Sequence, residues 1–153
     1  MKKYFPIFKN NPKLIYLDSA ATSQIPQVTI NVLKKYYSNY HSNVHKGIHT
    51  LSEKATYLLE KTRKEIKKLL NAKTEKECIF VKGTTEALNL LAYCLNDYLQ
   101  LKKTDIILTT ITEHHANFLP WKILSNKTNC ILKIIPIKKN GTLNLTQIKK
   151  ELN

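Results

Sequence analysis

Short apolar runs that favour β-strands alternate with helical segments through the second half of the chain, and this alternation most constrains the fold. The runs cover residues 78–82, 105–110 and 130–137, and apolar residues recur at helical spacing over 85–99 and about 116–124. Strands that alternate with helices build a layered sheet covered by helices. The pattern predicts an α/β fold with a mostly parallel sheet and flanking helices.

The first half of the chain reads as an N-terminal arm followed by helices. We expect the arm over residues 1–15, a helix from about Pro26 to Tyr40 with proline near its first turn, and a loop over 39–47. Thr50 and Glu53 have the spacing of a capping box, so a long helix with an apolar stripe is predicted from Thr50. Residues 145–152 begin a last helical pattern.

A glycine–threonine turn lies where the first predicted strand becomes a helix. Gly83, Thr84 and Thr85 stand at this junction. The backbone N–H groups of a first helical turn are unpaired and the helix dipole favours negative charge, so the turn can hold an anion with the hydroxyls assisting. The alternative is that Thr84 or Thr85 only caps the helix.

A pair of histidines follows the second predicted strand directly. His114 and His115 come just after the run that ends at Thr110. In open α/β sheets, ligands bind beyond the carboxyl ends of the strands, so His114 and the glycine–threonine turn are expected at the same edge. Imidazole suits proton transfer near neutral pH. Turn and histidine together predict a site for a phosphate-bearing cofactor, pyridoxal phosphate.

Four motifs, in this order along the chain, resemble those of the cysteine desulfurases in the class V aminotransferase group, in particular the branch that serves iron–sulfur cluster assembly. They are Tyr-Leu-Asp-Ser-Ala-Ala-Thr at 16–22, Asn-Val-His-Lys-Gly-Ile-His-Thr-Leu-Ser at 43–52, Gly-Thr-Thr-Glu at 83–86, and Glu-His-His-Ala-Asn at 113–117 with Pro-Trp at 120–121. The resemblance implies the large domain of a PLP-dependent, aspartate aminotransferase-like transferase, of which residues 16–153 would be an incomplete N-terminal part.

The resemblance also implies roles for individual residues. Thr84 and Thr85 would hold the cofactor phosphate, and His114 would stack on the pyridine ring and assist proton transfer at the substrate adduct. Ala20 and Ala21 would lie at the wall of the substrate pocket. No metal ligand is implied.

The family commonly has arginine after the histidine of the second motif, whereas this chain has Lys46. Lysine offers a point charge in place of a planar fork, which puts a bidentate anion contact there in doubt. The family's Schiff-base lysine, its pyridinium-pairing aspartate and its persulfide-forming cysteine correspond to positions beyond Asn153. The isolated chain is therefore expected to be inactive, because covalent cofactor catalysis needs that amine and that paired ring nitrogen.

The function implied by the resemblance is conversion of L-cysteine to L-alanine, with sulfur passed on as an enzyme persulfide. A homodimer and a sulfur-acceptor protein of iron–sulfur assembly are the implied partners. Two alternatives stay open: a related class V enzyme, such as a selenocysteine lyase or aminotransferase, and a non-catalytic truncated remnant.

The charge and cysteine patterns argue against other classes. The net charge is +14, but the lysines are spread along the chain and Arg63 is the one arginine. No nucleic-acid motif is present, so no nucleic-acid partner is expected. No run is long and apolar enough for a membrane span. Cys78, Cys94 and Cys130 are expected to be buried, reduced thiols, which with the absence of a secretion signal predicts the cytoplasm.

Three histidines recur every four residues, at positions 41, 45 and 49. On a helix this spacing would place three imidazoles on one face for zinc. Asn43 and Gly47 are poor helix formers, however, and the helix start signal comes only at Thr50. The loop interpretation is therefore favoured over a metal site, and the resemblance implies that this loop lines the entrance of a cofactor pocket.

Overall fold

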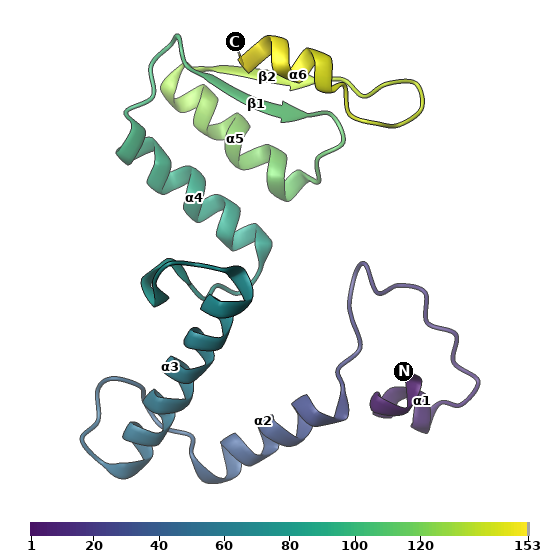
Figure 1. Cartoon of the computed structure of the whole chain (residues 1–153), viewed down its shortest axis with the longest axis vertical. Helices are drawn as coiled ribbons and strands as arrows, with labels where there is room; N and C mark the ends of the chain where they lie inside the picture. Colours follow the sequence, from purple (N-terminus) through teal and green to yellow (C-terminus); the bar gives the residue numbers. More distant parts are fainter. Residues whose placement is uncertain (153) are drawn as a thin grey trace. The chain divides into compact units, whose positions relative to one another are not determined.

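The structure, a computed structural model, describes residues 1–152 of the chain. It forms two compact units that meet in sequence between Cys78 and Ile79 (Figure 1).

The first unit is helical. Its longer helices confirm the predicted helix after Pro26 and the predicted long helix from Thr50. The expected N-terminal arm contains two short helices. The elements are η1 (Lys2–Tyr4), α1 (Pro6–Asn10), α2 (Gln27–Asn39), α3 (Thr50–Leu70) and η2 (Glu75–Glu77).

The start of α3 differs from the predicted capping box. Thr50 is the first helical residue, and the N-cap is His49, whose Nδ1 accepts a hydrogen bond from the Ser52 N–H at 3.4 Å. The predicted capping box was wrong, because it placed the N-cap at Thr50, one residue after the observed N-cap. Behind this turn, Ser52 and Ala55 are the buried residues of α3.

Three helices end at residues other than glycine in the left-handed conformation. Asn71 ends α3 with φ 53°, Gln100 ends α4 (Thr84–Leu99) with φ 50°, and Asn129 ends α5 (His115–Thr128) with φ 59°. Such a residue stops the helix and lets its N–H reach back to the last carbonyls, as Asn71 does to Lys67 and Lys68.

The second unit has the predicted strand–helix alternation. Strand β1 (Ile106–Thr110) runs parallel to β2 (Ile131–Ile135), with Ile106 opposite Ile131. Helix α5 connects the two strands and contacts both, and α4 packs on α5 (Figure 1). The last helix, α6 (Leu145–Leu152), is tied to β2 by an ion pair between Lys133 and Glu151.

The core of this unit lies between the strands and the two helices that cover them. Its most buried side chain is Ile135 at 2% exposure, and Ala92 of α4, Leu124 of α5 and Cys130 are also buried. The parallel pair and its helical layer confirm the predicted α/β class.

The predicted strand over 78–82 is absent. These residues form no strand, and Ile79 and Phe80 are 69% and 47% exposed. A strand exists only with a hydrogen-bonding neighbour. Within residues 1–152 the one sheet consists of β1 and β2, so this apolar run has no strand beside it.

The cysteine prediction was right for Cys78 and Cys130, which are buried free thiols, and wrong for Cys94, which is exposed. Ala92 is the buried residue of α4. Cys94 comes two positions later, about 200° around the helix, so it points away from the packed face.

Candidate functional site

The glycine–threonine turn forms the uncapped N-terminus of α4. Gly83 is the N-cap, and no side chain caps the turn. The first backbone hydrogen bond of the helix runs from the Ala87 N–H to the Gly83 carbonyl at 3.1 Å. In the described part of the chain, neither the Thr84 nor the Thr85 hydroxyl forms a hydrogen bond, so the alternative that one of them caps α4 is not what the structure shows.

The space in front of this turn is open. A Cβ at Gly83 would meet no atom within 4 Å. The Glu86 carboxylate, also in the first turn, folds back and accepts a hydrogen bond from the Lys82 N–H at 2.6 Å. The amides and hydroxyls of Thr84 and Thr85 therefore remain available to an external acceptor.

His114 is the N-cap of α5, four residues after the end of β1. Its Nδ1 accepts a hydrogen bond from the Ala116 N–H at 3.1 Å. The ring is exposed, and its centroid lies 6.3 Å from that of His115. Because Nδ1 is used as an acceptor, neutral His114 carries its proton on the other ring nitrogen, Nε2.

The turn before α4 and His114 lie on the same end of the second unit. Helix α4 leads into the amino end of β1, and α5 starts from the carboxyl end of β1, so the N-termini of both helices lie at the end to which β1 points (Figure 1). This is the edge at which α/β folds bind ligands.

Ala20 and Ala21 belong to the first unit. They lie in an exposed turn in which the Ala21 N–H donates to the Asp18 carbonyl at 3.2 Å, and the Tyr16 hydroxyl donates to the carbonyls of Asp18 and Thr22. Their placement at a substrate pocket stays a prediction.

A network of side chains around His114 was not foreseen from the sequence. Thr110 Oγ1 donates to Glu113 Oε1 at 3.1 Å, Asn117 Nδ2 donates to Glu113 Oε2 at 2.7 Å, and Trp121 Nε1 donates to Asn117 Oδ1 at 2.9 Å. The signal available in the sequence was the spacing of four between Glu113, Asn117 and Trp121. Asn117 and Trp121 share one face of α5, and Glu113 precedes the N-cap His114.

The three histidines of the first unit have separate partners. His41 packs on Tyr37 with ring centroids 5.2 Å apart, His45 Nε2 lies 3.2 Å from a Glu60 carboxylate oxygen, and His49 caps α3. Among residues 1–152, no group of three His, Cys, Asp or Glu side chains could hold a metal ion.

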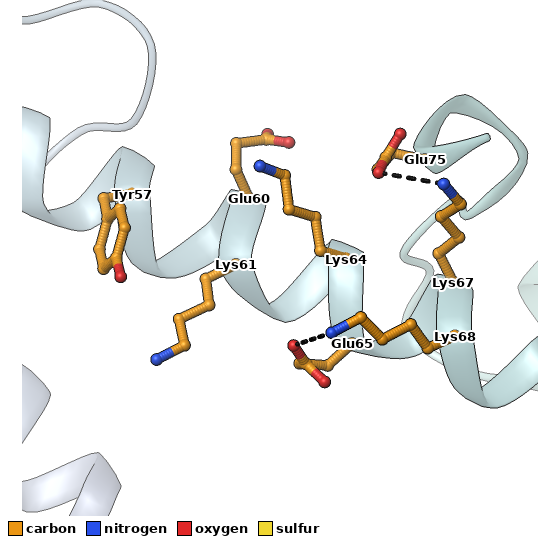
Figure 2. Close-up of a pocket in the computed structure, with 8 residues that line it drawn as sticks. All are labelled: Tyr57, Glu60, Lys61, Lys64, Glu65, Lys67, Lys68 and Glu75. Carbon is orange, nitrogen blue, oxygen red and sulfur yellow. Dashed lines mark hydrogen bonds and ion pairs between the residues drawn. The ribbon is translucent and has the colours of Figure 1, made fainter.

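The lysine-rich face of α3 is a second place where charged groups gather. Figure 2 shows a shallow cleft there, in which Lys67 contacts Glu75 at 3.4 Å and Lys68 contacts Glu65 at 3.0 Å. The pKa of Glu75 lies below its ordinary value of 4.5, first because its own backbone N–H donates to the carboxylate and then because of Lys67. Lysines and carboxylates are interspersed, which is typical of a solvated helix face.

Helices that could cross a membrane are not found in the part of the chain that the structure describes.

Comparisons with a family model and with known proteins agree on one family. Residues 15–153 match the model described as Aminotransferase class-V. Probable cysteine desulfurases of Staphylococcus epidermidis and Staphylococcus aureus are 45% and 44% identical over 154 residues, which is 99% of this chain and 37% of those proteins. The chain thus spans little more than a third of the length of these relatives.

Solved structures agree. A cysteine desulfurase from Thermococcus onnurineus NA1, in its apo form, has a TM-score of 0.89 at 36% identity and covers 99% of this chain and 36% of that one. The cysteine desulfurase CsdA of Escherichia coli has a TM-score of 0.81 at 28% identity, covering 99% and 37%. These proteins have the PLP-dependent aminotransferase fold, which confirms the predicted fold class.

Proposed function

The chain belongs to the class V aminotransferase family, and on that premise we propose that it is the N-terminal portion of a PLP-dependent cysteine desulfurase. The full protein would convert L-cysteine to L-alanine and pass the sulfur on as an enzyme persulfide for iron–sulfur cluster assembly. The observation that carries the proposal is the uncapped turn of α4 on the same end of the second unit as His114.

The residues of the α4 turn fit a phosphate group. Two unpaired amides, two unbonded hydroxyls and open space at Gly83 suit an anion at the positive end of a helix of 16 residues. Thr84 and Thr85 would hold the phosphate of pyridoxal 5′-phosphate. When bound, this cofactor supplies an electron sink for carbanion chemistry at the substrate.

His114 would lie over the cofactor ring and move a proton at the substrate. The hydrogen bond from Ala116 holds Nδ1, so Nε2 is the atom that would give or take the proton. Ala20 and Ala21 would contribute to the wall of the substrate pocket.

The partners and the location are part of the same proposal. We propose L-cysteine as substrate, a homodimer for the full-length protein, a sulfur-acceptor protein of iron–sulfur assembly, and a cytoplasmic location. Neither nucleic acid nor membrane is proposed as a partner. The chain by itself would be inactive.

The phosphate assignment is tested by measuring the dissociation constant of pyridoxal phosphate from the 153-residue chain. Equilibrium dialysis gives this constant, with the absorbance of the cofactor as the readout. Thr84→Val and Thr85→Val keep the side-chain shape but remove the hydroxyl, and each is expected to weaken binding several-fold. Thr104→Val, an exposed threonine at the amino end of β1, is the matched control and should bind as the wild type does. Equal binding by all four proteins would contradict the assignment.

The catalytic claim is tested by incubating the isolated chain with L-cysteine and pyridoxal phosphate. Alanine and sulfide should not exceed the amounts that free cofactor releases. Release above that level would contradict the proposed inactivity. The same assay on a full-length protein, with selenocysteine as second substrate, separates a desulfurase from a selenocysteine lyase.

A further inference from the structure

A continuous series of side-chain hydrogen bonds connects the residues before and after His114. The series starts at Thr110, the last residue of β1, and ends at Trp121, in the second turn of α5. Glu113 and Asn117 form its middle and are half-buried. His114 therefore sits between a strand end and a helix that are tied together by side chains.

Backbone hydrogen bonds hold the same turn in addition to these side-chain hydrogen bonds. The Ile111 N–H donates to the Ile135 carbonyl of β2 at 3.1 Å, and the Asn117 N–H donates to the His114 carbonyl at 2.8 Å. The Glu113 N–H lies 3.4 Å from the Thr110 carbonyl. These bonds fix where the turn lies, while the side chains fix how it enters α5.

The donors and acceptors available on these side chains allow only one arrangement of the hydrogen bonds. The Trp121 indole can only donate, so the atom of Asn117 that faces it must be the oxygen. The Asn117 NH₂ group then faces Glu113, and the carboxylate can only accept there. Thr110 completes the set by donating to the other carboxylate oxygen. No member can be reversed without losing a hydrogen bond.

The side-chain hydrogen bonds affect the imidazole of His114 through the backbone of the first turn of α5. His114 Nδ1 can accept from the Ala116 N–H only while the cap residue keeps its extended backbone, φ −61° and ψ 146°, and the next residues are helical. Glu113 and Asn117 flank the cap and are joined over it. A looser turn would free the ring to rotate and would let Nδ1 carry the proton.

We propose that Glu113 and Asn117 are positioning residues for His114, which keep its neutral imidazole protonated on Nε2 and so fix the atom that transfers the proton. The catalytic meaning of this role rests on the proposed function. The tautomer of His114 depends on hydrogen bonds within the protein, so it can be measured without cofactor or substrate.

The test is ¹H–¹⁵N correlation NMR of the His114 ring in the whole 153-residue chain, at a pH at which the imidazole is neutral. In the wild type, Nδ1 should show the shift of an unprotonated nitrogen and Nε2 that of a protonated one. Asn117→Ala and Glu113→Ala should bring the two shifts toward each other, because the two tautomers then exchange. Asn126→Ala, an exposed asparagine on the same helix, should leave them unchanged.

The conservative variant Glu113→Gln separates positioning from charge. Glutamine can accept from Asn117 with its oxygen and donate to the Thr110 hydroxyl, which in turn can donate to Thr112 at 3.0 Å. It should therefore keep the wild-type shifts. If it behaves as Glu113→Ala does, or if neither alanine variant moves the shifts, the proposal is wrong.

Trp121→Phe is the milder variant to use if the alanine variants do not fold. It removes one donor and leaves the ring packing, so Asn117 becomes free to flip and a partial change of the His114 shifts is expected. Unchanged shifts in a folded Trp121→Phe together with a folded Asn117→Asp variant, which loses the NH₂ donor, would overturn the proposal. Neither result affects the threonine test of phosphate binding, so the two failures can be told apart.

Discussion

Within residues 1–152, two helices start at a histidine, and the two starts are built differently. His49 caps α3 and His114 caps α5, each through Nδ1, which accepts from Ser52 at 3.4 Å and from Ala116 at 3.1 Å. Before α5, side chains bond to one another. Before α3, side chains of the helix bond to the backbone of the preceding loop. The same cap is thus part of a side-chain network in one place and part of an anchored loop in the other.

The anchors before α3 lie on one face of the helix. Ser52 is fully buried; its hydroxyl donates to the Asn43 carbonyl at 2.7 Å and accepts from the Gly47 N–H at 3.1 Å. Thr56 and Glu60, spaced by four from Ser52, bind the backbone N–H and the ring of the loop's second histidine at 2.9 and 3.2 Å. Residues that repeat every four share a helix face, so the loop is fastened along a line.

The largest effect is expected from Gly47→Ala. Its Cβ would lie 2.6 Å from the Cβ of Ser52 and 2.7 Å from its hydroxyl, and the buried serine has no room to move. Such overpacking costs about 1–3 kcal/mol, which urea unfolding followed by circular dichroism would measure. Gly83→Ala, which meets open space, should cost about 1 kcal/mol or less, as a poorer N-cap. Equal losses for the two variants would contradict the tight approach.

Ser52→Ala should come next. It leaves the Asn43 carbonyl and the Gly47 N–H without their partner, at about 1–2 kcal/mol. The loop should also open, so trypsin should cleave after Lys46 faster than in the wild type. Ser42→Ala, which removes no hydrogen bond that the structure describes, is the control. Unchanged cleavage in Ser52→Ala would show that the loop is held by other contacts.

Replacing each capping histidine separates its structural role from its chemistry. His49→Ala and His114→Ala should each cost about 1 kcal/mol, because each removes an N-cap acceptor. Asparagine also caps well, so His49→Asn and His114→Asn should both regain stability. Of these two, only His114→Asn should alter the absorbance of bound pyridoxal phosphate. If His49→Asn altered it equally, the contrast between the two starts would fail.

The smallest effect concerns Glu75, which touches neither histidine. Its pKa lies below 4.5 in the folded chain, so its contacts stabilise the fold above the unfolded pKa, and that stabilisation is lost as the pH falls through the folded pKa. Lys67→Gln should raise the pKa of Glu75 only in part, because the backbone N–H is the larger cause. An NMR titration measures it, with Lys61→Gln as the control. An unchanged pKa of Glu75 in Lys67→Gln would show that the ion pair does not lower it.

The sequence predicted elements whose cause is local. Apolar spacing found α3, α4 and both strands, and the order of strands and helices predicted the α/β class. The strand over 78–82 failed because pairing depends on a neighbour that local pattern does not reveal. The box at Thr50 failed because histidine is not among the usual capping residues, so the true cap was overlooked.

The candidate site was predictable in its types of residue but not in its bonding. The turn at Thr84 and the histidine after β1 follow from motif and topology. The chain from Thr110 to Trp121 requires particular rotamers and one orientation of the Asn117 amide, which the order of residues does not encode on its own. Interactions of side chains across a turn depend on the folded backbone that brings them together.

The helix ends at Asn71, Gln100 and Asn129 have a consequence for engineering the protein. A residue with a Cβ adopts the left-handed conformation at an energetic cost, which glycine avoids. The chain has only three glycines, and none of them ends these helices. These three positions therefore offer stability that can be gained at the C-terminal ends of α3, α4 and α5, while both histidine-capped starts are left untouched.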